Sequence, residues 1–161
     1  MSYLVIQRGL TVQPIRQTAL GLEREAKVAQ YLTTVYPWVL TATPKYYFTD
    51  YHINEMQGGG YESYIGDLEI LWCNYSYTQP TFVAFTKLQQ MSILPLYKDL
   101  ESAFHRLVFR FTDGLFIVPV EALQPFRPIV HNHFVRDDLT KLVVRLELAN
   151  YMQFYKPIII R

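Results

Sequence analysis

The feature that most constrains the fold is an alternation of polar and apolar residues in the run 66–72. Side chains that are two positions apart on a strand share a face. Leu68, Ile70 and Trp72 therefore face one way, and Asp67 and Glu69 face the other. The pattern predicts a half-buried strand with an apolar face in the core and two carboxylates on the opposite face.

A second strand is predicted at residues 81–87, because this run is rich in aromatic and β-branched residues and ends in Lys87. Turn-forming residues occupy positions 74–80 between the two runs, which favours an antiparallel hairpin. In such a hairpin Asp67 and Lys87 would face each other. A carboxylate and an ammonium group placed in this way can hold a divalent metal ion and the phosphate that it activates.

The rest of the chain is predicted to alternate between helices and strands. Helices are predicted where apolar residues recur at helical spacing, and strands where aromatic and β-branched residues gather. The predicted helices are 18–32, 94–111 and 137–154, and the further strands are 38–43, 46–53 and 115–120, with a loop at Gly58–Gly60. This order predicts an α/β fold with a mixed central β-sheet flanked by helices.

Length and composition fit a globular protein. The 161 residues suit a single domain spanning 1–161, half of them are hydrophobic, and no apolar run is long enough to cross a bilayer. The net charge of +1 gives no strong global field for nucleic acid, although local basic clusters remain possible. The start of the chain lacks the features of a secretory signal, so a cytoplasmic location is expected and no membrane is expected among the partners.

The motifs and their order resemble the PD-(D/E)XK nuclease superfamily, whose restriction-endonuclease-like core is αβββαβ. The resemblance rests on Glu25 within the first helix, Gly66-Asp67 on one strand and Phe85-Thr86-Lys87 where that family carries an acid-x-Lys triplet. It implies a metal-dependent DNA endonuclease that uses Mg²⁺, with Mn²⁺ as a substitute. Asp67 and Glu69 would bind the metal, and Asp67, Lys87, Glu25 and Glu69 would form the catalytic group. Cleavage of both strands needs two active sites, so a homodimer or higher homo-oligomer is expected.

The sequence departs from that pattern at Phe85, because phenylalanine cannot bind a metal ion. Glu69, Glu25 or an amide oxygen of Gln89 or Gln90 could supply the missing ligand. If none does, the chain is a catalytically inactive nuclease-like fold that binds nucleic acid or serves as an assembly subunit. A further alternative is an unrelated α/β interaction domain, in which Asp67 only opens a strand, Lys87 only ends one, and Glu25 lies on the solvated side of its helix.

Other polar and aromatic residues have weaker claims. Lys45, Tyr75, Tyr77 and Gln89 are predicted to contact nucleic acid, while the excess of tyrosine suits a subunit interface equally well. His131-Asn132-His133 is predicted to be a surface loop rather than a metal site. Cys73, the single cysteine, excludes an intrachain disulfide and is predicted to be a buried thiol on a strand.

Overall fold

The computed structural model describes residues 19–97, 105–136 and 139–157. The helices and strands follow the chain in this order: α1 Ala19–Val35, β1 Trp38–Ala42, β2 Tyr51–Met56, β3 Glu62–Trp72, β4 Thr81–Ala84, α2 Phe85–Tyr97, β5 Arg106–Arg110, β6 Leu115–Pro119, β7 Pro128–Arg136, β8 Leu139–Leu146 and β9 Tyr155–Lys156. Two 3₁₀ helices, η1 Val120–Leu123 and η2 Leu148–Phe154, connect parts of the second half. The predicted α/β class with a mixed central sheet is confirmed, and the order αβββαβ is present with β4 added before α2.

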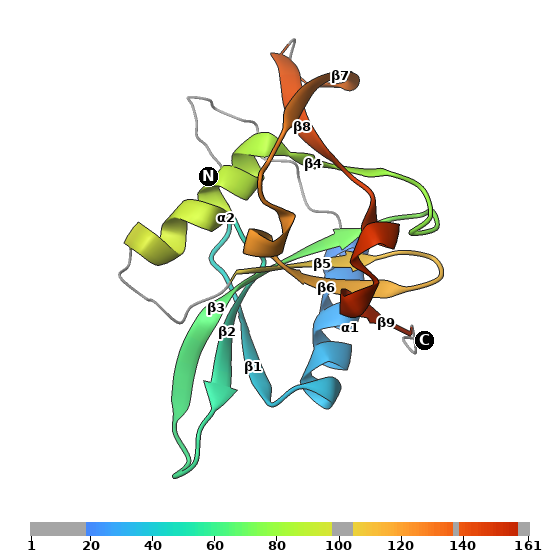
Figure 1. Ribbon diagram of the computed structural model, residues 1–161. Coiled ribbons are helices and arrows are strands. Elements are labelled where there is room, and N and C mark those ends of the chain that lie inside the picture. Colours follow the sequence, from blue (N-terminus) through green and yellow to red (C-terminus); the bar gives the residue numbers. More distant parts are fainter. Residues whose placement is uncertain (1–18, 98–104, 137–138, 158–161) are drawn as a thin grey trace.

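A six-stranded sheet in the order β1-β2-β3-β5-β6-β9 forms the centre of the fold. β3 and β5 run parallel, whereas the other neighbouring strands are antiparallel. A separate three-stranded sheet has the order β4-β8-β7. Figure 1 shows α1 on one side of the large sheet, and α2 with the small sheet on the other.

Alternation along the central strands fills a separate core on each face of the large sheet. Leu68 and Ile70 of β3 pack with Val28 and Leu32 of α1 in one core. The other core lies under α2 and the small sheet, with the members Val83, Leu88, Met91, Leu107, Phe109, Phe116, Val118 and Val144 among others. Asp67 and Glu69, which alternate with Leu68 and Ile70, therefore belong to the face that carries α2.

The predicted hairpin between residues 66–72 and 81–87 is wrong. β3 pairs with β2 and β5, while β4 pairs with β8 in the other sheet. The strand ends at Ala84 and a helix begins at Phe85, which places Lys87 on α2. Leu88 and Met91 are both buried, three residues apart, so this segment buries its apolar side chains as a helix does.

Two of the predicted helices are also wrong in their extent or type. Residues 106–110, placed at the end of a helix over 94–111, form β5, and residues 98–104 lie outside the described part. β5 is covered on both faces, so its continuous apolar run resembles a buried helix in sequence. The predicted helix 137–154 is instead β8 followed by η2, because Val143 and Val144 sit in a strand paired on both sides.

The remaining segments agree more closely with prediction. α1, β1 and β6 occupy the predicted positions, and Gly58–Gly60 lies in the turn between β2 and β3. β2 begins at Tyr51 rather than at residue 46. Residues 131–133 lie within β7 and not in a loop, because His131 pairs with Lys141 of β8. Within the described residues, no helix is long and apolar enough to cross a membrane.

Candidate active site

The candidate site lies on the face of β2 and β3 that is turned toward α2. The backbone N–H of Asp50 donates to the carbonyl of Leu68 at 2.9 Å, so the start of β2 lies beside the middle of β3. One carboxylate oxygen of Asp50 accepts from the backbone N–H of Ile70 at 2.7 Å. These two contacts place the Asp50 side chain next to Glu69, the residue between Leu68 and Ile70.

Asp50 and Glu69 form a close pair of carboxyl groups. Burial raises the pKa of Asp50, against the lowering effects of the Ile70 N–H, the charge of Lys87 and a hydrogen bond with Glu69. Burial also raises the pKa of Glu69 well above its ordinary value, and the charge of Asp50 raises it further. Two partly buried carboxyl groups in contact repel each other when both are ionised, so a proton or a cation stabilises the pair.

Lys87 supplies one positive charge from α2. Its ammonium nitrogen lies 3.4 Å from an Oε of Glu69, with side-chain exposures of 24% and 14%. The same ammonium group donates to the backbone carbonyl of Phe48. Lys87 therefore bridges the acidic pair and the segment that leads into β2, although it reaches them from a helix instead of a neighbouring strand.

Glu25 approaches the same region from α1. Its charge raises the pKa of Glu69 and that of Tyr51, and its own side chain is partly buried. Asp50, Glu69 and Lys87 therefore form the site, and the charge of Glu25 acts on it from α1.

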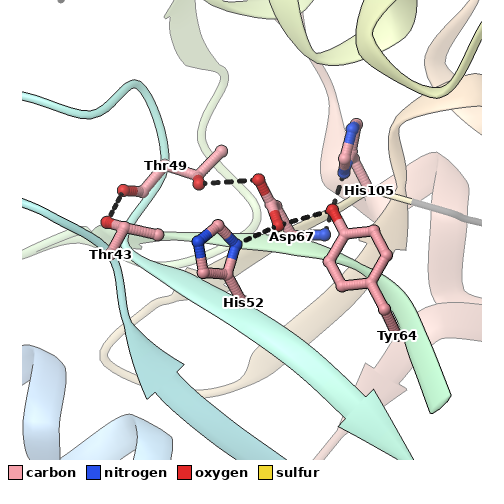
Figure 2. A network of polar contacts seen from close by, with 6 residues as sticks. All are labelled: Thr43, Thr49, His52, Tyr64, Asp67 and His105. Atoms are coloured by element: carbon pink, nitrogen blue, oxygen red, sulfur yellow. Dashed lines mark hydrogen bonds and ion pairs between the residues drawn. The ribbon is translucent and has the colours of Figure 1, made fainter. Parts of the chain in front are cut away.

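Asp67 belongs to a separate network beside this site (Figure 2). Its side chain is fully buried and both of its oxygens accept hydrogen bonds. One oxygen accepts from the Tyr64 hydroxyl and from Nδ1 of His52, each at 2.7 Å, and the other accepts from the Thr49 hydroxyl at 3.1 Å. Asp67 forms an ion pair with His52, and Lys87 forms one with Glu69, so the expected face-to-face pairing of Asp67 and Lys87 is not formed.

The residues predicted to contact nucleic acid lie in different places. Lys45 is exposed and its ammonium group lies over the ring of Tyr46. The Tyr75 hydroxyl forms a hydrogen bond with the Thr81 hydroxyl. The rings of Tyr75 and Tyr77 both pack against the core under α2. Gln89 lines an open groove of about 660 Å³, whose other lining residues are Phe85, Ser92, Gln124, Pro125 and Phe126. Cys73 is buried, as predicted.

Asp50 is the site residue that the sequence interpretation missed. It lies inside the predicted strand 46–53, where the sequence pattern gives it no special position. The sequence signal that could have identified Asp50 is its place directly before the alternating residues 51–54, two positions after the aromatic run 46–48. An acid at the start of a strand lies on the same sheet face as every second residue of the neighbouring strand. Which residues these are can be predicted only when the pairing of the two strands is known.

The donor set fits a hard divalent cation. Within residues 19–97, 105–136 and 139–157, no group of three or more His, Cys, Asp and Glu side chains is arranged to hold a metal ion. Mg²⁺ needs fewer protein ligands, because one or two carboxylates, waters and a substrate phosphate complete its octahedral shell. Asp50 and Glu69 are two neighbouring carboxyl groups whose pKa values are raised chiefly by burial, and a bound cation would favour their charged forms.

Comparisons with known proteins gave a structural match. No protein-family model matches the sequence, and no curated protein matches it. Among solved structures, the chain is similar to the Holliday junction resolvase Hjc of the archaeal hyperthermophile Archaeoglobus fulgidus. The TM-score is 0.43 and the sequence identity is 11%, over 81% of this chain and 92% of the resolvase chain. The chemistry of this chain is therefore inferred from its own side chains.

Proposed function

We propose that this protein is a metal-dependent nuclease of the PD-(D/E)XK type that hydrolyses phosphodiester bonds in DNA. The observation that carries the proposal is the partly buried pair of Asp50 and Glu69, with Lys87 at 3.4 Å from Glu69. The pKa values of both carboxyl groups are raised. In this proposal Asp50 takes the metal-binding place expected for Asp67, since both oxygens of Asp67 already accept hydrogen bonds.

Asp50 and Glu69 would hold Mg²⁺, or Mn²⁺ as a substitute, in the position that their mutual repulsion leaves for a cation. The bound ion supplies charge stabilisation at the phosphate and lowers the pKa of a bound water. Lys87 keeps the Glu69 carboxylate oriented and places an ammonium group beside the scissile phosphate, where it stabilises charge that grows on the phosphate oxygens. Glu25 adds negative charge that strengthens cation binding by the pair.

The reaction is a hydrolysis. The oxygen of a water molecule bonds to phosphorus, the bond from phosphorus to one sugar oxygen breaks, and solvent takes and returns the protons. Phe85 is no obstacle to this chemistry, because the lysine and the second acid come from α2 and β3 instead of one triplet.

The test is cleavage by the purified full-length protein with Mg²⁺ or Mn²⁺. Substrates should include duplex, four-way branched and single-stranded DNA, with RNA as a comparison. Asp50→Asn, Glu69→Gln and Lys87→Met should each abolish cleavage. Glu62→Gln is the matched control, because Glu62 is an exposed acid on the same strand that bonds Asn54.

Two results would overturn the proposal. The first is an absence of cleavage with every substrate, together with no binding of Mn²⁺ in calorimetry; nucleic-acid binding without cleavage would then indicate an inactive nuclease-like subunit. The second is cleavage by the Asp50, Glu69 and Lys87 variants at the wild-type rate, which would identify a contaminant.

We propose further that the active form is a homodimer or a higher homo-oligomer, because cutting both strands of a duplex needs two active sites. Light scattering of the purified protein at cleavage concentration tests this proposal. A monomer that cuts both strands in one binding event would refute it.

A further inference from the structure

The segment 43–50 carries two groups of the proposed active site but has no regular secondary structure. It holds the Asp50 carboxylate and the Phe48 carbonyl that accepts from Lys87. Tyr46 adopts a φ of 69°, which few non-glycine residues adopt. An irregular segment has no ladder of hydrogen bonds to fix it, so other contacts must set the positions of these two groups.

Hydrogen bonds hold the segment in its middle and at its ends: the N–H of Tyr47 donates to the carbonyl of Pro44 at 3.0 Å, and Asp50 is bonded to Leu68 and Ile70 of β3. The N–H of Thr43 donates to the carbonyl of Asp50 at 3.0 Å, and the Thr43 hydroxyl donates to the carbonyl of Thr49. These contacts close the segment on itself. The Thr49 side chain, only 3% exposed, then reaches across to β3, where its hydroxyl donates to an Asp67 oxygen at 3.1 Å.

Asp67 is itself held in place from several sides (Figure 2). Its other oxygen accepts from His52 on β2 and from Tyr64 on β3. Its backbone N–H donates to Nδ1 of His105, a residue with 3% exposure. Asp67 is therefore a fixed acceptor within the sheet, beside a connection that has no ladder of its own.

Burying this carboxylate has a cost, because a charge removed from water is unfavourable unless several hydrogen bonds compensate for it. Three donors meet Asp67, and one of them, Thr49, comes from the irregular segment. An apolar pair at these two positions would avoid the cost but would not fix the direction of residue 49. The charged acceptor Asp67 adds a directional hydrogen bond that orients Thr49, the residue next to Asp50.

We propose that Asp67 is a positioning residue that acts through Thr49 to hold the Asp50 carboxylate and the Phe48 carbonyl at the active site. This inference rests on the proposed nuclease function. Loss of the anchor displaces two groups together: a carboxylate that would bind the metal and the carbonyl that orients Lys87. Misplacement by about 1 Å is enough to slow catalysis by roughly a hundredfold.

Thr49→Val is the main test, because valine keeps the shape of threonine and removes the hydroxyl. Thr81→Val is the matched control: Thr81 is also 3% exposed, and its hydroxyl bonds the Tyr75 hydroxyl at 2.7 Å, away from segment 43–50. Each variant is measured for Mn²⁺ affinity by calorimetry, for kcat and KM in cleavage, and for thermal unfolding.

The expected result is a loss of roughly tenfold or more in Mn²⁺ affinity and in kcat for Thr49→Val, with KM little changed. Thr49→Ser, which keeps the hydroxyl, should restore most of both. Thr81→Val should lower Tm by a similar amount and leave Mn²⁺ affinity at the wild-type value. If Thr49→Val fails to fold, Asp67→Leu, which has no acceptor for the Thr49 hydroxyl, is measured in its place, and its loss of Mn²⁺ affinity should not add to that of Thr49→Ala in the double variant.

Equal effects of Thr49→Val and Thr81→Val on Mn²⁺ affinity would overturn the inference, and so would wild-type affinity in Thr49→Val. Additive losses in the double variant would overturn it as well. A wild-type protein that neither binds Mn²⁺ nor cuts nucleic acid would instead refute the proposed function, and the inference with it.

Discussion

Replacement of Glu69 by glutamine should stabilise the metal-free protein at neutral and alkaline pH while abolishing its response to metal. Burial and the nearby Asp50 charge raise the pKa of Glu69 well above its ordinary value of 4.5. At a pH between the ordinary pKa and the raised pKa, Glu69 keeps its proton in the folded protein, whereas Glu69 in the unfolded chain has released it. The stability contributed by this proton is therefore present at low pH and is lost as the pH rises toward the raised pKa.

The magnitude follows from linkage. One proton of difference changes the free energy of unfolding by about 1.4 kcal/mol per pH unit. For a chain of this length, that is a fall in Tm of roughly 3 to 6 °C per pH unit. Glutamine loses the ion pair with Lys87, but a partly exposed pair contributes only about 0 to 1 kcal/mol. Removal of the charge that burial and Asp50 disfavour is therefore the larger effect above the ordinary pKa of glutamate.

The assay is thermal unfolding in EDTA from pH 5 to pH 9, followed by titration with Mn²⁺. Wild type should lose stability with rising pH, and Glu69→Gln should show a flatter profile. A metal ion at a hundred times its Kd adds about 2.7 kcal/mol to wild type and nothing to the variant. A variant that is less stable than wild type in EDTA at alkaline pH would refute the assignment of Glu69 to a repulsive carboxyl pair.

Three further outcomes are expected. Lys87→Met should fold, as circular dichroism will show, but lose at least about a hundredfold in cleavage rate because the charge beside the phosphate is gone; cleavage within threefold of wild type would contradict its role. Gly114→Ala should destabilise the protein by about 1 to 3 kcal/mol in urea unfolding, because its Cβ would overlap the ring of Tyr155. Phe109→Ala should cost about 3 to 5 kcal/mol in the same assay, since Phe109 is fully buried, and an unchanged midpoint would contradict that packing.

The sequence predicted local structure well wherever one face of an element is buried. The alternation over 66–72 identified β3 and its core face, and the spacing of apolar residues over 18–32 identified α1. It failed for β5, because a strand covered on both faces has no polar face to give it a period of two. It failed for β8, because the neighbours Val143 and Val144 are both buried between the exposed Leu142 and Arg145, which is not an alternating pattern.

Strand pairing was the information that the site required and that local patterns could not supply. Glu69 and Lys87 were identified as candidates, and the structure brings them together through α2. Asp50 was missed because its partner lies on β3, across a turn whose register depends on the whole sheet. Asp67 has the stronger local motif, but both of its carboxylate oxygens already accept hydrogen bonds from other side chains.

A lysine on α2 has a consequence for how the proposed site assembles. A lysine two positions from an acid on one strand is fixed relative to that acid by the strand itself. Lys87 is fixed by the packing of α2, through the buried Leu88 and Met91, by its ion pair with Glu69 and by its bond to the Phe48 carbonyl. The lysine and Asp50 are therefore both coupled to segment 43–50. Disorder in this segment would remove a metal ligand and the phosphate-facing charge together, so the site should lose function in one step instead of residue by residue.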